Sequence, residues 1–459
     1  MARMIRELLL GNPILLLLLA CLGFLSTLLF FHLSSKNQKI GSFFNYLFAY
    51  IFVILSPVLT QPPLNYLHPI NIAKQPSKQV LNFLPLFFYP LVFIVLWSKL
   101  FFFSKNIIQM SSIIFKKNPT FLLYIFLPPL SSAWSLAPRP TLEFGLALFI
   151  TTFLSIYIAS QYNWIELSKI LRFSYLFIGL FSYVKQPPGS GDWTGITLSK
   201  NALGGILSIC TALWFLEYSQ GNKEAKSRYL ALLFTVISFF LVRTGRSAGA
   251  LISTIIIIAI LLSLNFVKKL NFRWALTCIV VMMALNICVG LIVIENLEAI
   301  FTSLEKDMTL TGRTIIWPLI LEEIYKSPWL GYGFGGFWQN WRGDDSPGYV
   351  IMTENGWSPP NAHNGFIDIF LAFGLIGLTL FIFSFINNIL NAVYYLIEEK
   401  IELSGVPIIF IMYIVLNNIT ESTLAGNNHV WSAYVMITVR LCIDTINTKL
   451  VKIQKKHKN

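Results

Sequence analysis

The chain has 459 residues, of which 55% are hydrophobic and 12% are charged, and its mean hydropathy is +0.66. A water-soluble protein of this length could not cover so much apolar surface with polar side chains, so the composition excludes a soluble globular protein. The formal net charge of +13 would suggest nucleic-acid binding in a soluble chain. Here the basic residues form short clusters between apolar runs, which is typical of orientation signals in membrane proteins, and no nucleic-acid partner is expected.

A bilayer core about 30 Å thick requires about 20 mostly apolar residues for each helical span. Such stretches recur along the whole chain and predict an all-α, polytopic transmembrane bundle of about 12 to 14 spans. The predicted spans lie near 8–31, 43–58, 82–103, 119–131, 141–159, 170–184, 201–217, 229–243, 248–267, 274–294, 364–396, 404–420 and 429–447. The first run follows Arg3 and Arg6 but continues without a cleavage site, so it is interpreted as a retained span and not as a signal peptide. The segment 119–131 is short and contains Pro128 and Pro129, so we expect it to be broken or tilted.

The lysine and arginine bias of the short loops predicts how the bundle is oriented. If the spans alternate, four basic segments fall on one side, which should be the cytoplasm: 105–117, 223–228, 268–273 and 449–458. The loops that then face outward are 59–81, 132–140, 185–200, 243–247, 295–363 and 421–428. An odd number of spans would place Arg3 and Arg6 on the outside, so the N-terminal region is expected to hold a hairpin or an interfacial helix.

These assignments divide the chain into four regions. They are an N-terminal transmembrane bundle (1–294), an extracytoplasmic loop with an amphipathic helix (295–363), C-terminal transmembrane helices (364–448) and a basic cytoplasmic tail (449–459). In the loop, TGRTIIWPLILEEIYKSP has apolar residues at near-helical spacing and ends at Pro328. This pattern predicts a helix from about Thr311 that lies on the membrane or covers a cavity. The GYGFGGFWQNW that follows is typical of a tight loop that presents aromatic rings to a partner.

Charged residues at the mouths of apolar spans are costly and require an explanation. Arg243 and Arg246 lie in LVRTGRSAG, at the outer end of one span and the start of the next. Snorkelling into the headgroup region is the alternative explanation for both side chains. Arg313 lies at the start of the predicted outer helix, where a guanidinium group and free backbone N–H groups can hold a phosphate. The alternative for Arg313 is a solvated surface arginine.

His363 directly precedes a long span that carries Asp368 one turn further on. Histidine is the natural general base near neutral pH, although a histidine at a helix start is also a common cap or packing residue. Lys200, Asn201 and Glu421 stand at other outward span ends. Because polar outliers from separate segments fall on one face, under a topology derived from other residues, the sequence predicts a polar site at the outer face.

Several short motifs occur in order from about residue 130 onward. They are SAWS at 132–135, S-K-N-A-L-G at 199–204, R-S-A-G at 246–249, T-G-R-x3-W at 311–317, S-P-x2-G-x-G at 327–333, A-H-N-G-x5-L-x2-G-L-x-G-L at 362–378 and T-E-S at 420–422. Each motif is weak alone, but their order, spacing and membrane context resemble the O-antigen ligase and Wzy-type polymerase superfamily. One departure is Thr244-Gly245-Arg246, since many relatives have a serine before the arginine.

The resemblance implies a metal-independent, inverting glycosyltransferase of the GT-C-like membrane class, without a cofactor. Its donor would be an undecaprenyl-diphosphate-linked oligosaccharide and its acceptor a glycan or the lipid A core, at the outer face of the bacterial cytoplasmic (inner) membrane. By the family pattern His363 would be the catalytic base, and Arg246 and Arg313, with Arg243 nearby, would hold the diphosphate. The candidate supporting residues are Lys200, Asn201, Glu421, Asn364 and Trp317.

Three functions fit the sequence. A polysaccharide polymerase or ligase is the leading hypothesis, and the S-K-N-A-L-G motif slightly favours an exopolysaccharide-type polymerase. A lipid-linked glycan flippase or another multi-span transporter should carry ionisable groups near mid-membrane and paired half-repeats, whereas here the polar outliers gather at span ends. A non-catalytic assembly partner is the third. Trp338, Trp341 and Trp357 offer rings for sugar faces, and interfacial anchoring explains each of them equally well.

Overall fold

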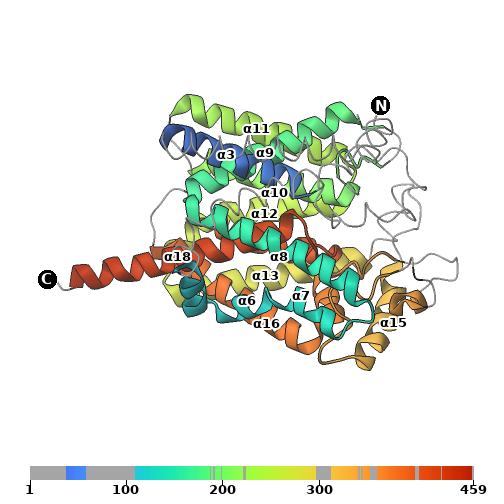
Figure 1. Cartoon of the computed structure of the whole chain (residues 1–459). Helices are drawn as coiled ribbons and strands as arrows, with labels where there is room; N and C mark the ends of the chain where they lie inside the picture. The colour runs from blue at the N-terminus through green and yellow to red at the C-terminus, as the bar shows by residue number, and fades with distance from the viewer. Residues whose placement is uncertain are drawn as a thin grey trace, which may run out of the picture.

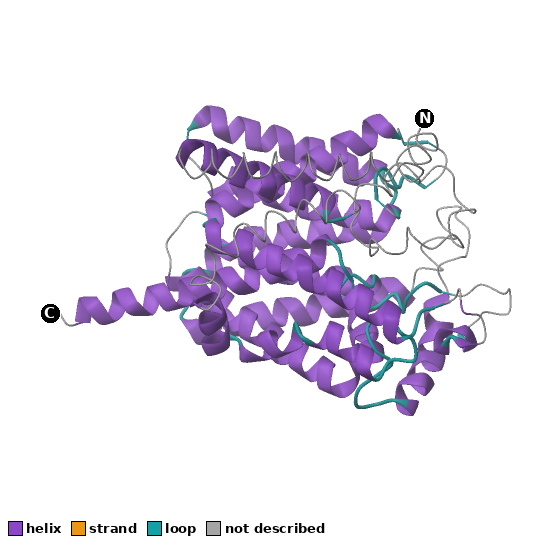
Figure 2. Ribbon diagram, viewed as in Figure 1, coloured by secondary structure: helices purple, strands orange, loops and turns teal. Residues whose placement is uncertain are grey.

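The computed structural model describes the structure of residues 38–57, 109–186, 188–189, 192–197, 199–220, 224–295, 312–339, 342, 345–351, 359–398, 403–424 and 426–456. The predicted spans 8–31 and 82–103 and the N-terminal hairpin lie outside these residues. Within the described part of the chain, helices are the regular elements and no strand occurs (Figure 2).

The bounds of the helices follow the predicted spans closely. They are α3 (Gln38–Leu55), α6 (Pro119–Tyr124), α7 (Leu127–Leu130), α8 (Pro138–Gln161), α9 (Trp164–Lys185), α10 (Lys200–Gln220), α11 (Ala225–Thr244), α12 (Ala248–Val267), α13 (Phe272–Glu295), α15 (Gly312–Lys326), α16 (Gly365–Glu398), α17 (Val406–Thr420) and α18 (His429–Lys456), with short 3-10 helices at Ser131–Ala133 and Pro347–Val350. Seven of these are long and apolar enough to cross a membrane: α8, α9, α10, α11, α12, α13 and α16. α18 is not among the seven, because the paired Arg440 and Asp444 interrupt its apolar run. The prediction of an all-α polytopic membrane protein is therefore confirmed.

The segment 119–131 is broken, as its prolines predicted. α6 ends at Tyr124 and α7 begins only at Leu127, with Pro128 in the first turn of α7. Proline tolerates the first turn of a helix but not its interior, because it lacks the N–H group that the helix needs. The short α7 packs closely on α8, since a Cβ at Gly145 would lie 2.6 Å from the carbonyl carbon of Pro128.

The predicted continuous span 364–396 is wrong in one respect, because α16 is two helices joined at a kink. Gly374 has φ 61° and ψ −162°, which is a conformation that only glycine adopts readily. The backbone of Trp329 passes so close that a Cβ at Gly374 would lie 2.2 Å from its carbonyl carbon. Leu375 N and Ile376 N donate hydrogen bonds to carbonyl oxygens of this passing segment. The outer loop therefore inserts its backbone into the break in the helix.

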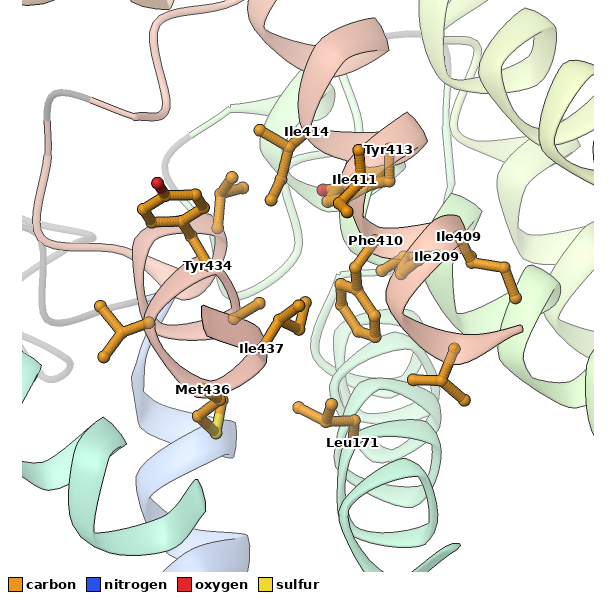
Figure 3. Packing of buried hydrophobic residues seen from close by; sticks show 14 of the residues in the cluster. Leu171, Ile209, Ile409, Phe410, Ile411, Tyr413, Ile414, Tyr434, Met436 and Ile437 are labelled. Atoms are coloured by element: carbon orange, nitrogen blue, oxygen red, sulfur yellow. The ribbon is translucent and has the colours of Figure 1, made fainter. Parts of the chain in front are cut away.

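The centre of the bundle is α17, which contacts α10, α12, α13, α16 and α18. Nearly every described side chain of α17 is buried, and Figure 3 shows Phe410 and Ile411 facing the neighbouring helices. A helix that is apolar on all sides is typical of a position enclosed by other helices. An ion pair also lies in the interior. Arg172 Nη1 lies 2.6 Å from Glu217 Oε2, and the guanidinium group of Arg172 lies over the ring of Trp214.

The predicted outer helix forms as α15. Of its two predicted placements, on the membrane or over a cavity, the burial of its isoleucine face favours the covering one. Ile316, Ile320 and Ile324 are buried in a small cluster with the loop and α16. The apolar face of α15 therefore packs on protein, and α15 covers the end of the bundle (Figure 1). α15 lies at one end of the molecule, and the C-terminal part of α18 projects from the other end.

The glycine-rich loop after α15 also differs from its prediction. Phe334 and Phe337 are buried, and Phe334 stacks on Phe373 of α16 at 5.8 Å between ring centroids. Gly331 and Gly333 have positive φ. The backbone here lies against α16, because the N–H groups of Tyr332 and Gly333 donate hydrogen bonds to carbonyl oxygens of that helix. The rings of Phe334 and Phe337 therefore face into the protein, because the glycines let this backbone lie directly against the helix. Trp338 is only partly buried.

Candidate functional site at the α15 end of the bundle

His363 stands on a tightly fixed turn between the outer loop and α16. Its φ is 51°, which is uncommon for a residue other than glycine. The backbone N–H of His363 donates to Asn361 Oδ1 at 2.9 Å. The preceding residue, Ala362, is held from two sides, since its N–H donates to the Asp368 carboxylate at 3.2 Å and its carbonyl accepts from Trp317 Nε1 at 3.0 Å. These bonds hold the backbone of the turn in this conformation.

The structure brings His363 and Glu421 together. Nδ1 of His363 lies 4.0 Å from Glu421 Oε2, which is too long for a hydrogen bond but short enough for an ion pair if the histidine is protonated. Their side chains are 23% and 19% exposed, so a solute can reach them while their interaction is only partly screened by water. The close approach of α16 and α17 makes this pairing possible, because a Cβ at Gly365 would lie 2.1 Å from Asn418 Oδ1. Asn364 N also donates to Ser422 Oγ at 3.0 Å.

Asn201 and Ser247 extend this pair across the bundle. Asn201 Nδ2 donates to Glu421 Oε1 at 2.7 Å, and Asn201 Oδ1 accepts from Ser247 Oγ at 3.1 Å. Ser247 is also the N-cap of α12. α10 and α12 lie close enough for this contact because Gly204 leaves room, since its Cβ would lie 2.7 Å from that of Ala250. A continuous polar chain therefore runs from Ser247 through Asn201 and Glu421 to His363.

Two of the predicted arginines lie at the Ser247 end of this chain. Arg243 is in the last turn of α11, and Arg246, with φ 51°, lies in the three-residue connection to α12 directly before Ser247. Both side chains are exposed, and neither pairs with a carboxylate of the described residues. Their positive charge is therefore available to an anion. Lys200, which directly precedes Asn201 in the sequence, pairs with Asp192 at 2.8 Å, which offsets its charge.

Arg313 is in the first turn of α15, where the sequence predicted it. Its side chain lies outside the described residues. Its backbone is one helical turn before Trp317, about 6 Å along the helix axis, and Trp317 binds the carbonyl next to His363. The segment that carries Arg313 is therefore part of the same end of the molecule. Of the candidate supporting residues, Trp317 donates a hydrogen bond to the backbone of the His363 turn. The side chain of Asn364 accepts from a backbone N–H at the start of α16 and so caps this helix.

Sequence reasoning missed how Asp368 is used. Its carboxylate is buried and accepts from Trp338 Nε1 at 2.7 Å in addition to Ala362 N, so it joins the aromatic loop to the His363 turn. It also missed the roles of Ser247, Asn361 and Ser422. The available signal was that Ser247 and Ser422 belong to the motifs R-S-A-G and T-E-S and that Asn361 directly precedes A-H-N-G. Trp341 and Trp357 lie outside the described residues.

One ionisable group outside the spans is held neutral near the site. Burial, followed by the charge of Glu323 and a hydrogen bond to it, raises the pKa of Tyr332 above its usual range. Tyr332 Oη donates to Glu323 O at 2.9 Å and fixes the loop to the end of α15. Tyr332 therefore holds the loop in place and is unsuited to acid–base chemistry at neutral pH.

Fold and site together define a multi-pass helical membrane protein with a histidine–glutamate pair and exposed arginines at one end of its bundle. Residues 230–382, which include His363 and the three arginines, match the family described as O-antigen ligase. The chain is also similar to the exopolysaccharide production protein ExoQ of Rhizobium meliloti (strain 1021), with 25% identity over 260 residues, or 54% of this chain. These findings confirm the resemblance to the O-antigen ligase and Wzy-type polymerase superfamily. The matched part spans 59% of the length of ExoQ.

Proposed function

We propose that the protein is a membrane glycosyltransferase that uses an undecaprenyl-diphosphate-linked glycan as donor at the outer face of the bacterial cytoplasmic membrane. The observation that carries this proposal is the polar chain from Ser247 to His363, with a base at one end and exposed arginines at the other. The family match over 230–382 supports the reaction class.

In the proposed reaction, a hydroxyl oxygen of the acceptor sugar attacks the anomeric carbon of the donor. The bond from this carbon to the diphosphate oxygen breaks, the hydroxyl proton passes to Nε2 of His363, and undecaprenyl diphosphate leaves. Because Nδ1 faces Glu421, Nε2 lies on the far side of the imidazole ring. Glu421 stabilises the imidazolium that forms, and Asn201 holds Glu421 in place.

The arginines would act on the leaving group. A departing diphosphate gains negative charge, and guanidinium groups stabilise it through their charge and their paired N–H donors. Arg246 lies in a strained turn next to Ser247, so its backbone is fixed before substrate arrives. We assign the diphosphate to Arg246, Arg243 and Arg313. The scheme uses neither a nucleotide sugar nor a metal ion.

Between the two activities of the superfamily, we favour a polymerase over a ligase. The similarity to a protein named for exopolysaccharide production supports this choice, together with the S-K-N-A-L-G motif. A polymerase transfers a growing glycan onto another lipid-linked repeat, whereas a ligase would use an acceptor such as the lipid A core. The flippase alternative is disfavoured because the polar chain from Ser247 to His363 and the exposed arginines lie at one end of the bundle.

The test is reconstitution of the full chain in proteoliposomes with the lipid-linked oligosaccharide of its host, followed by sizing of the products. We expect longer glycans from the wild type and none from His363→Ala or Arg313→Ala, with membrane insertion unchanged. Arg139→Ala is the matched control, because Arg139 is an exposed arginine that pairs only locally with Glu143. Full activity of His363→Ala would exclude the mechanism, and transbilayer movement of the oligosaccharide without elongation would favour the flippase.

A further inference from the structure

A pocket of about 270 Å³ lies beside the His363 turn, since Asn361 and Ser422 are among its lining residues. It is enclosed by α8, the glycine-rich loop, the start of α16 and the 422–427 segment. The lining residues are Phe144, Ala147, Gly333, Phe334, Gly335, Phe337, Trp338, Pro360, Asn361, Asp368, Leu371, Ala372, Ser422, Gly426 and Asn427. None of these residues comes from α10, α11, α12 or the 245–247 connection, the segments that carry or adjoin Asn201, Arg243, Arg246 and Ser247.

The lining has the chemistry of a sugar site. A pyranose has apolar C–H faces and a rim of hydroxyl groups, and this pocket combines aromatic rings such as Trp338 with short polar side chains such as Asn361 and Ser422. Its volume is just below the roughly 300–1,000 Å³ of pockets that hold drug-sized ligands, which suits one monosaccharide unit. The lining includes the carboxylate of Asp368 and no lysine or arginine, so it is unsuited to a diphosphate.

The pocket is directly connected to the proposed catalytic pair. Asn361 lines it and accepts the hydrogen bond from His363 N, and Ser422 lines it next to Glu421. Asp368 holds both the indole of Trp338 and the backbone next to His363. A sugar on Trp338 would therefore meet a surface held by the same carboxylate that holds the backbone next to His363.

We propose that this pocket binds the terminal sugar of the acceptor glycan. The inference rests on the proposed function, because in an inverting displacement the attacking hydroxyl and the leaving group stand on opposite sides of the anomeric carbon. In the proposed reaction the base accepts the proton of the attacking hydroxyl, so the acceptor sugar must lie beside His363, whereas the diphosphate is assigned to Arg243, Arg246 and Arg313. The pocket lies beside the His363 turn and offers groups that recognise a sugar but not an anion.

Equilibrium binding to the full chain in nanodiscs tests the proposal with two probes. The first is the repeat oligosaccharide released from the lipid-linked intermediate of the host by mild acid, and the second is undecaprenyl diphosphate without sugar. Trp338→Ala and Ala147→Leu should each weaken oligosaccharide binding by about tenfold or more, as expected for loss of a buried aromatic anchor or of pocket space, and leave undecaprenyl diphosphate binding within about twofold. Arg246→Ala should do the opposite.

Trp329→Ala is the matched control for Trp338→Ala, because Trp329 belongs to the same outer segment but is 64% exposed and lies outside the pocket. It should change neither affinity. Ala147→Leu fills the pocket from α8 without touching the bond between Trp338 and Asp368, so it keeps the test valid if Trp338→Ala fails to fold.

Three results would overturn the acceptor site: no oligosaccharide binding to the wild type, unchanged oligosaccharide affinity in a folded Ala147→Leu protein, or a loss confined to undecaprenyl diphosphate. These outcomes differ from failure of the proposed function. That failure would appear as absence of glycan elongation by a wild-type protein that still binds the oligosaccharide in this pocket.

Discussion

The charge of Glu421 should matter more for the chemical step than for folding or substrate binding. In Glu421→Gln the side-chain carbonyl can still accept from Asn201 Nδ2, which bonds to Oε1 at 2.7 Å, but the negative charge 4.0 Å from His363 is lost. Two unit charges at 4 Å interact by about 1 kcal/mol in bulk water and about 4 kcal/mol at an effective dielectric constant of 20. Both side chains are about one-fifth exposed, so the true value lies between these limits.

This interaction is made with the imidazolium that forms as the proton is transferred, so its loss should lower kcat. At 1.36 kcal/mol for each factor of ten, the expected decrease is roughly 5-fold to 1,000-fold. The donor KM should stay unchanged, since the diphosphate is assigned to the arginines. The assay is initial-rate elongation of lipid-linked oligosaccharide in proteoliposomes at several donor concentrations.

Glu143→Gln is the matched control for this change. Glu143 is a glutamate of α8 that pairs with Arg139 one turn earlier in the helix. Its side chain is 15% exposed, similar to that of Glu421. It should leave both constants at wild-type values. If kcat of Glu421→Gln stayed within twofold of the wild type, or if the donor KM rose while kcat did not change, Glu421 would not be the partner of the catalytic base.

Three further changes test the packing around the site. Asp368→Asn removes a buried charge that accepts hydrogen bonds from an indole N–H and a backbone N–H. It should destabilise the protein by about 1.5–3 kcal/mol, seen as a lower melting temperature in detergent, and it should lower the rate of glycan transfer. A wild-type melting temperature would show that the carboxylate is dispensable. Gly374→Ala should prevent correct folding, because its Cβ would lie 2.2 Å from a backbone carbon, whereas Gly249→Ala, with nothing within 4 Å, should melt at or above the wild-type temperature. Arg172→Met should destabilise the bundle by about 3–5 kcal/mol by leaving Glu217 buried and unpaired, and adding Glu217→Leu should restore much of the loss in the same melting assay.

The sequence determined which segments become helices and roughly where they end. α8 to α13 follow the apolar runs to within a few residues, because the cost of placing polar groups in lipid acts on each segment by itself. The break at 119–131 was also predictable, since proline disrupts a helix through its own backbone. The order of motifs and the charge of the loops were sufficient to indicate the superfamily and one polar end.

Contacts between segments were not readable from these patterns. The kink at Gly374 exists because a distant backbone enters the helix there, and the rings of the glycine-rich loop face inward because that loop lies on α16. The predicted histidine and glutamate became a pair only through the approach of α16 and α17, and Ser247 joined them only through the closeness of α10 and α12. Hydrophobicity and backbone propensity are properties of a segment alone, whereas the meeting of two segments depends on how their surfaces fit together in three dimensions.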